Sequence, residues 1–345
     1  MLDRITVSPH HGTMRLKKIR FANGYKRFRD LTIDLGETPA RVVALVGPNG
    51  CGKSSVLDGL LYHATAFGQI GLGGRRDFQY HSMDQLPSYS WQNVQLEFTL
   101  GNYQQIREKQ KIIGKEQTIF SFRSPYRFNN QLKITETQAT SEIKLNDYGA
   151  ADASSLDSKM EGNYRRLYAA YNQYMEKEDA KPSEAKAKII GDLNESIRAC
   201  LDLEISSIGN VEASKGTLYF RKIGQPNDFE FNVLSSGEKE VVDLILDLYL
   251  RRTDYNDTVF LLDEPELHIN TSIQRKLLLE INKLIGSECQ IWLTTHSIGF
   301  LRALQTELRD DCQIIHFRSD LELASKSCVL RHSKVTPALW RNYFP

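Results

Sequence analysis

The stretch Gly47-Pro48-Asn49-Gly50-Cys51-Gly52-Lys53-Ser54 fits the pattern G-x-x-x-x-G-K-[ST], and the rest of the sequence is interpreted around it. Residues 41–46 lead into it as a nearly unbroken apolar run, which predicts a buried parallel strand. Residues 53–67 follow with apolar side chains at helical spacing. In this order of strand, glycine loop and helix, backbone N–H groups turn inward and cradle a phosphate.

The chemistry of such a loop assigns roles to its residues. Lys53 is expected to reach the outer phosphates of a nucleotide, and the Ser54 hydroxyl to ligate Mg²⁺. The predicted nucleotide-binding set at this loop is Gly47, Pro48, Asn49, Gly50, Cys51, Gly52, Lys53, Ser54 and Ser55. The cofactors that follow from it are ATP and Mg²⁺.

Composition excludes several other classes of protein. The 345 residues suffice for one large domain or two ordinary ones. Lys and Arg number 44 against 43 Asp and Glu, so the net charge of +1 gives no overall attraction to nucleic acid. The sequence has no run of 18 apolar residues and no signal peptide at its start, and its five cysteines lack metal-binding spacing. We therefore expect a cytoplasmic protein with free thiols and no membrane segment.

The order of patterns along the chain predicts four regions: a polar tail at residues 1–13, an N-terminal lobe at 14–150, a helical insertion at 151–204 and a C-terminal lobe at 205–345. Apolar alternation predicts antiparallel strands at 16–21, 31–35 and 94–100, and shorter runs near 119–122, 132–134 and 143–145 extend them as a β meander. Two helices are expected in the insertion, the second beginning at Pro182.

Three features of these regions leave their role open. The hairpin at residues 17–29 mixes Lys and Arg with Phe21, Tyr25 and Phe28, which suits either nucleic-acid contact or an ordinary hairpin with buried aromatics. Tyrosines at helical spacing over residues 164–174 favour core packing over a partner surface. Arg75 and Arg76 lie in a glycine-rich loop, where they either return to the phosphates or remain on the surface.

Two further apolar strands end in charged residues. Residues 258–262 run into Asp263 and Glu264, and residues 290–293 run through two threonines into His296. Because ligands bind at the carboxyl edge of a parallel sheet, these side chains are expected to meet the phosphate loop. Asp263 is predicted to hold Mg²⁺, Glu264 to activate the attacking water as general base, and His296 to contact the outer phosphate. With Lys53, Glu264 and His296 make up the predicted catalytic set.

Together these motifs resemble the motif set of ABC-type ATPases. The phosphate loop, Leu234-Ser235-Ser236-Gly237-Glu238, Leu262-Asp263-Glu264-Pro265 and Thr295-His296-Ser297 match the P-loop, signature, Walker B and switch motifs of that family. The glutamate that ends the signature and the run Glu264-Pro265-Glu266-Leu267-His268 resemble the SMC, RecF and OLD branch. The resemblance implies an α/β fold of P-loop NTPase type: a mostly parallel sheet flanked by helices, with an antiparallel β subdomain and a short helical insertion.

The resemblance also implies a head-to-head homodimer, or a higher homo-oligomer, with ATP between the subunits. In such a dimer Ser235, Ser236, Gly237 and Glu238 would contact the nucleotide of the partner chain. Glu266, Leu267 and His268 would form the segment that crosses the interface. The family's Q-loop glutamine would be Gln69, Gln79, Gln85 or Gln92.

The sequence departs from the branch in having no long coiled-coil arm and no Toprim nuclease, so it resembles stand-alone ATPase subunits of bacterial anti-phage systems of the PARIS or Septu type. The expected function is an ATPase whose dimerisation controls a separate nuclease, Toprim-like or other toxic effector. The alternative is a RecF-like DNA-repair ATPase that acts directly on DNA. A subunit of a membrane transporter is a third reading, which the sequence after Asp263 disfavours.

Overall fold

A six-stranded parallel sheet forms the centre of the computed structural model, which describes residues 12–22, 24–67, 93–115, 118–123, 151–152, 156–209, 217–253, 255–317 and 327–332. Its strand order is β13-β3-β12-β11-β6-β7, and every pairing in it is parallel. The strands are β3 (Val42–Val46), β6 (Phe120–Arg123), β7 (Ala151–Asp152), β11 (Val259–Asp263), β12 (Gln290–Thr295) and β13 (Cys312–His316). The predicted α/β class is confirmed.

Two smaller sheets flank the parallel one. The first has the order β14-β2-β1-β4-β5 and the second the order β10-β9-β8. Their strands are β1 (Leu16–Phe21), β2 (Asp30–Asp34), β4 (Val94–Phe98), β5 (Gly101–Asn102), β8 (Leu203–Ser207), β9 (Tyr219–Lys222), β10 (Asp228–Glu230) and β14 (Ser327–Arg331). All their pairings are antiparallel except that of β14, which lies parallel to β2.

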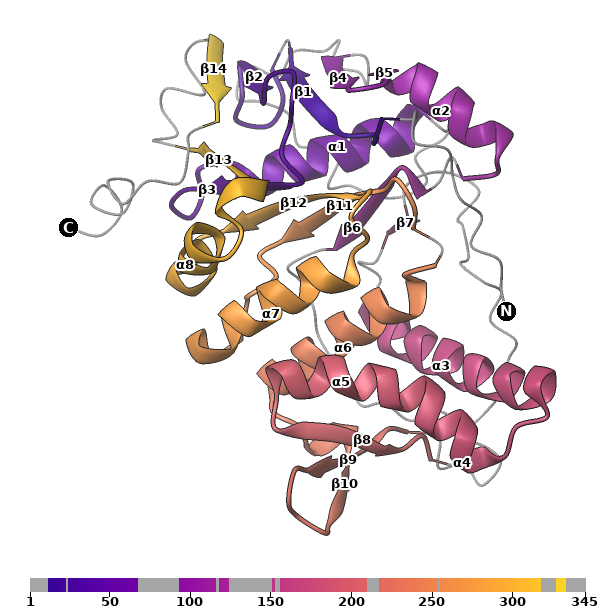
Figure 1. Ribbon diagram of the computed structural model, residues 1–345. Coiled ribbons are helices and arrows are strands. Elements are labelled where there is room, and N and C mark those ends of the chain that lie inside the picture. Colours follow the sequence, from indigo (N-terminus) through magenta and orange to yellow (C-terminus); the bar gives the residue numbers. More distant parts are fainter. Residues whose placement is uncertain are drawn as a thin grey trace.

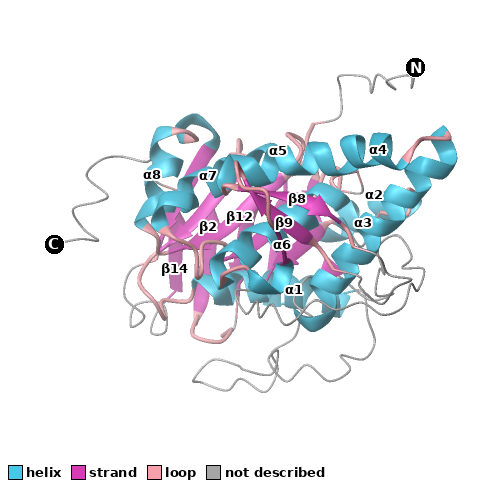
Figure 2. Ribbon diagram, turned by 90° about the horizontal axis from the view of Figure 1, so that it is seen from below, coloured by secondary structure: helices cyan, strands magenta, loops and turns pink. Residues whose placement is uncertain are grey.

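Helices separate these sheets into layers (Figures 1 and 2). The α-helices are α1 (Lys53–Phe67), α2 (Tyr103–Ile112), α3 (Leu156–Glu178), α4 (Pro182–Ala185), α5 (Gly191–Cys200), α6 (Ser236–Arg251), α7 (Thr271–Leu284) and α8 (Ile298–Thr306). Figure 1 shows α1 between the five-stranded sheet and the parallel sheet, with α6, α7 and α8 on the opposite face. The parallel sheet is therefore covered on both faces, which explains its unbroken apolar strands.

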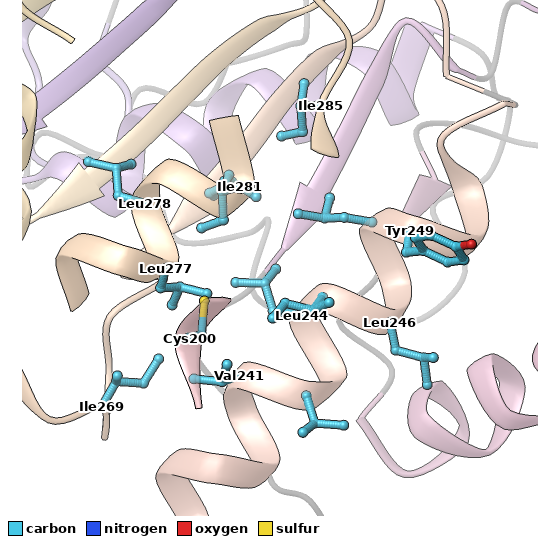
Figure 3. Close-up of a cluster of buried hydrophobic side chains, with 14 of the residues drawn as sticks. Cys200, Val241, Leu244, Leu246, Tyr249, Ile269, Leu277, Leu278, Ile281 and Ile285 are labelled. Atoms are coloured by element: carbon cyan, nitrogen blue, oxygen red, sulfur yellow. The ribbon is translucent and has the colours of Figure 1, made fainter. Parts of the chain in front are cut away.

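Alternating side chains of the parallel strands feed two separate hydrophobic cores. On β3, Val43 and Leu45 pack with α1 and the five-stranded sheet, whereas Val42, Ala44 and Val46 pack with α5, α6 and α7. Figure 3 shows part of the second core, where side chains of α6 and α7 meet Cys200 of α5. Each fully buried aliphatic side chain contributes roughly 1.5–3 kcal/mol, so the two cores fix β3 and its loop from both sides.

A buried charge cluster joins the parallel sheet to α6. Arg123, at the end of β6, is 3% exposed and donates from Nη2 to Asp243 Oδ2 at 2.6 Å and from Nη1 to Asp247 Oδ2 at 3.3 Å. Asn163 of α3 donates to the other oxygen of Asp243, and Arg251 Nε lies 3.0 Å from Asp247 Oδ1. Because buried charges need partners, this cluster fixes α6 against the sheet.

Several elements differ from the sequence-based expectations. The run near residues 119–122 is β6, which pairs in parallel with β11 in the central sheet and is not part of a meander. Residues 132–134 and 143–145 lie outside the described residues. The second helix of the insertion is α4 and α5 joined by a π-helical segment, Lys186–Ile190. Strands β8 and β14 and helix α2 were not predicted, and the expected boundary between residues 204 and 205 falls inside β8.

The structure favours ordinary packing for the two aromatic features. The hairpin aromatics Phe21, Tyr25 and Phe28 are at most 1% exposed, and they stack on one another. Among the hairpin cations, Lys17 pairs with Glu37 and Glu97, Arg20 pairs with Asp30, and Lys26 pairs with Asp58. In α3, Tyr164 is buried and donates its hydroxyl to Ile208 O at 2.5 Å. These rings belong to the core and offer no stacking surface for a base.

Replacing Arg123 by Met should destabilise the protein strongly, because Asp243 and Asp247 are buried and each would lose an ion pair. We expect a loss of about 3–5 kcal/mol in equilibrium urea unfolding. The matched control is Arg20→Met, which removes the exposed pair with Asp30 and should cost less than about 1 kcal/mol. Equal losses for the two variants would contradict the role given to the cluster.

Candidate functional site

The glycine loop joins β3 to α1 and encloses the side chain of Lys53. Lys53 is 4% exposed, and its Nζ donates to Gly47 O and Pro48 O, both at 2.9 Å. Cys51 Sγ lies 3.9 Å from the same nitrogen. The predicted binding residues Pro48, Asn49 and Gly50 are exposed at the rim, while Gly47, Cys51, Gly52 and Ser55 are buried. The Lys53 ammonium group is therefore buried next to the exposed residues 48–50 of the loop.

Gly52 shows why the loop requires glycine. Its φ of +102° lies in the region that side chains disfavour, and a Cβ there would come within 2.7 Å of the Phe28 ring. Phe28 belongs to the basic hairpin. The buried Phe28 ring thus packs against the loop, while Phe21 and Tyr25 lie against Gly59 of α1.

Asp263 lies beside the start of α1. Its Oδ1 accepts a hydrogen bond from Ser54 Oγ at 3.0 Å and another from Thr294 Oγ1. Thr294 Oγ1 also accepts from the backbone N–H of Glu264 at 3.0 Å. The parallel register that pairs Asp263 with Thr294 produces this contact. Residues separated by more than two hundred positions therefore meet at one edge of the sheet, as the sequence predicts.

Burial controls the electrostatics of Asp263. The side chain is 2% exposed, and desolvation raises the pKa of Asp263 to about 6, although the hydrogen bonds from Thr294 and Ser54 act in the opposite direction. The carboxylate is therefore costly to keep ionised until a cation approaches it.

Glu264 and His296 form a second pair at the same edge. His296 Nδ1 lies 3.2 Å from Glu264 Oε1, and the two side chains are 41% and 20% exposed. Glu264 has a φ of 44°, an uncommon value for a residue with a long side chain. The Glu264 carboxylate contacts the His296 ring from this backbone conformation. A partly exposed acid next to a histidine suits the polarisation of a water molecule.

The segment 235–238 begins α6. Ser235 is the N-cap: its Oγ accepts from Glu238 N at 3.4 Å, and Glu238 Oε2 accepts from Ser235 N at 2.8 Å, which is a capping box. Ser235 and Ser236 are exposed. Gly237 lies against the loop after β11, because a Cβ there would come within 2.8 Å of His268 O. The segment is accessible, and its glycine touches the loop that carries Glu264.

Glu266 differs from the sequence-based expectation. We predicted that it crosses a subunit interface, but it is 3% exposed and its carboxylate is engaged within its own chain. Its Oε1 accepts from Thr295 Oγ1 and from the backbone N–H of His296 at 3.3 Å. Burial raises the pKa of Glu266. Leu267 is half-buried and His268 is exposed, so the interface prediction still stands for these two residues.

The structure thus brings Lys53, Ser54, Asp263, Glu264 and His296 to one edge of the sheet. Sequence reasoning missed Thr294 and Thr295, although two adjacent hydroxyls before a histidine at a strand end were a visible signal. The Q-loop candidates Gln69, Gln79, Gln85 and Gln92 and the arginines at 75 and 76 lie outside the described residues.

The sequence of residues 42–302, about three quarters of the chain, matches the family described as "AAA domain, putative AbiEii toxin, Type IV TA system". The chain belongs to this family. This is a family of P-loop ATPases, and the loop, the acidic strand end and the neighbouring histidine described above lie within the matched segment.

Two curated relatives support the same class. The AAA-domain chain is 53% identical to the chromosome partition protein Smc of Thauera aminoaromatica over 13% of its own length and 4% of the relative. It is 38% identical to the lipoprotein-releasing system ATP-binding protein LolD 1 of Rhodospirillum rubrum over 22% of its length and 43% of the relative. The chain spans less than half the length of either relative.

Similar solved structures include SMC head domains. One is the SMC head domain from Thermotoga maritima, with a TM-score of 0.43 and 17% identity over 93% of this chain and 99% of that one. Another is an Smc head with an extended coiled coil bound to the C-terminal domain of ScpA, from Pyrococcus furiosus, with a TM-score of 0.48 and 12% identity over 95% and 98%. Because these scores lie below 0.5, the family assignment is based on the sequence match.

The donor set at the site suits a magnesium ion. Asp263 and Ser54 offer a carboxylate and a hydroxyl oxygen side by side, and Mg²⁺ prefers oxygen ligands together with water and phosphate. Among the described residues, no group of three or more His, Cys, Asp and Glu side chains gathers as a self-sufficient metal site. In the described part of the chain, no helix is long and apolar enough to cross a membrane.

Asp263→Asn should stabilise the protein when no metal is present. The amide oxygen keeps both accepted hydrogen bonds, whereas the buried charge disappears. Because the folded pKa of about 6 exceeds the ordinary 3.8, the stability that Asp263 gives the wild-type protein is present below pH 4 and is lost as the pH rises through 6. A pKa difference of about two corresponds to about 3 kcal/mol of unfolding free energy. In EDTA at pH 7.5, Asp263→Asn should therefore be about 1–3 kcal/mol more stable than the wild type.

Urea unfolding at pH 4.5 and pH 7.5, both in EDTA, measures this difference. Asp310→Asn, a change at an exposed aspartate, is the matched control and should leave the pH dependence unchanged. An Asp263→Asn variant with the same pH dependence as the wild type would contradict the electrostatic account.

Proposed function

We propose that the chain hydrolyses MgATP at the carboxyl edge of its parallel sheet. The observation that carries this proposal is the convergence of Ser54 with Asp263 and of Glu264 with His296 on the edge where Lys53 lies. Ser54 and Asp263 would hold Mg²⁺, which would neutralise phosphate charge, and Lys53 would bind the outer phosphates. Glu264 would orient and deprotonate the attacking water, and His296 would contact the terminal phosphate.

Glu264→Gln should separate ATP binding from hydrolysis. The amide keeps the size of the side chain but cannot accept a proton, so kcat should fall by about 10²–10⁴-fold. The affinity for ATP should change little, because Lys53, Ser54 and Asp263 remain in place. Steady-state turnover and calorimetric titration measure the two quantities, and unchanged turnover would remove Glu264 from its catalytic role. A control at an exposed glutamate of the opposite side, Glu37→Gln, should have wild-type turnover.

We further propose that two copies of the chain close over the nucleotides, with Ser235 and Gly237 of one copy facing the glycine loop of the other. This proposal is supported by the exposure of Ser235 and Ser236 at a helix start, where N–H groups suit an anion. The exposed apolar residues Val233 and Ile298 adjoin the signature and the switch histidine. These are two apolar side chains that a second copy would cover.

Mixing two inactive variants tests the shared site. Lys53→Ala and Ser235→Ala should each lack turnover as homodimers. A one-to-one mixture should recover about a quarter of wild-type turnover, since half the dimers are mixed and each holds one intact composite site. Full turnover of Ser235→Ala alone would contradict the arrangement. Asn102→Ala, which breaks the matching capping box of α2, controls for the loss of about 1 kcal/mol of helix capping.

We propose that this ATPase controls a separate toxic or nuclease effector, in the manner of anti-phage systems. The support is the family description, which names a toxin and a toxin–antitoxin system. The genes beside the encoding gene test this: a nuclease or Toprim-like gene supports it, and their absence across related genomes counts against it. The RecF-like alternative gains nothing from the hairpin, because its aromatics are buried and three of its cations pair with acids.

A further inference from the structure

The turn after β12 carries His296, and it is held in place by a buried carboxylate from another loop. Glu266 Oε1 accepts the Thr295 hydroxyl and the His296 backbone N–H, the latter at 3.3 Å. The ring of the same histidine contacts Glu264 at 3.2 Å. His296 is thus fixed at its backbone by one glutamate and at its imidazole by another, two residues apart in the chain.

The surrounding bonds show that the turn and the loop form one unit. Thr295 Oγ1, while donating to Glu266, accepts the N–H of Ser297 at 3.0 Å. Ser297 donates its hydroxyl to Gln274, whose Nε2 donates to Ile269 O at 2.9 Å. The turn at residues 295–297 is therefore tied to the loop after β11 at two places, and Glu266 is the one that touches His296 directly.

Glu266 carries a buried carboxylate at a position where an apolar side chain would be less costly to bury. It is 3% exposed, and its Oε2 makes no hydrogen bond with a described residue. Burying a carboxylate costs free energy that an apolar residue would not. What the carboxylate supplies is an acceptor that two neighbouring donors share, at the point where the histidine leaves the strand.

We propose that Glu266 is a positioning residue for ATP hydrolysis, which orients His296 and, through it, Glu264 toward the nucleotide. The inference rests on the proposed hydrolysis at this site. In this role Glu266 acts through Thr295 and His296, which its carboxylate contacts. It fixes the direction in which the imidazole points, so that the Glu264 carboxylate is held by its contact with a stationary ring. A misplacement of about 1 Å in such a group can cost about a hundredfold in rate.

Two pairs of variants test the proposal. Glu266→Ala removes the acceptor, and we expect kcat to fall by about 10–100-fold, with an unchanged dissociation constant for a non-hydrolysable ATP analogue with Mg²⁺. Glu266→Gln keeps an oxygen for both donors and should retain kcat within about threefold. Thr295→Val should lower kcat in the same direction, and Thr295→Ser, which keeps the hydroxyl, should restore it. This second pair serves if Glu266→Ala does not fold.

A readout without nucleotide measures the geometry itself. Hydrogen exchange of the peptide that spans residues 294–298 should speed up about tenfold or more in Glu266→Ala but not in Glu266→Gln, because the His296 N–H loses its acceptor only in the former. The matched control is Glu280→Ala, which changes a buried glutamate near the C-terminal end of α7, away from the turn at residues 295–297. It should lower the melting temperature without changing this exchange or kcat.

The outcomes separate the inference from the function on which it rests. If the wild-type chain hydrolyses no ATP, the proposed function fails, and if Glu264→Gln hydrolyses ATP like the wild type, only the catalytic role of Glu264 fails. If Glu264→Gln is slow but Glu266→Ala has wild-type kcat and exchange, only the positioning role is overturned. Equal losses of kcat in Glu266→Ala and Glu266→Gln would also overturn it, because the shared acceptor would then be irrelevant.

Discussion

The parallel register of β11, β12 and β3 is the constraint on which the site depends. It places Asp263 opposite Thr294 and Thr295 opposite Val46, the last residue before the glycine loop. Three chain segments that are far apart in sequence therefore end at the same height. A shift by one residue would turn the Thr294 hydroxyl to the other face of the sheet and break its contacts with Asp263 and Glu264.

Apolar contacts hold the strands of the sheet together, and polar contacts hold the acidic loops at its carboxyl edge. The two cores hold the strands and α1, and neither includes the acids. Threonine hydroxyls then attach the acidic loops to β12: Thr294 to Asp263 and Glu264, and Thr295 to Glu266. Because β12 presents the two hydroxyls on opposite faces, a single strand positions both Asp263 and the turn that carries His296.

The sequence specified the central elements well, because their patterns were local. Apolar runs before the glycine loop, before Asp263 and before His296 became β3, β11 and β12. The sequence-based predictions were wrong for strands whose place in the structure depends on pairing with a strand far away in the sequence. Nothing within Phe120–Arg123 distinguishes a strand of the central sheet from one of a meander; the pairing with β11 does so. Ser327–Arg331 alternates only weakly, and it becomes β14 because β2 offers it an open edge.

The candidate site shows the same division. Motif spacing was enough to select Lys53, Ser54, Asp263, Glu264 and His296. The burial of Glu266 could not be predicted, since its neighbour Glu264, in the same short run of residues, is partly exposed. The two residues differ in backbone geometry, because Glu264 has a positive φ of 44° and Glu266 does not.

The place of β3 in the sheet has a consequence for synthesis. Its two neighbours are β12 and β13, so Val42 can pair with Ile291 and Cys312 only after those residues have been synthesised. Until then a strand of five buried residues has no partner on either edge, although β1 and β2 can already form their hairpin. The nascent chain thus carries an apolar, unpaired segment until β12 has been synthesised, and chaperones typically cover exposed segments of this kind.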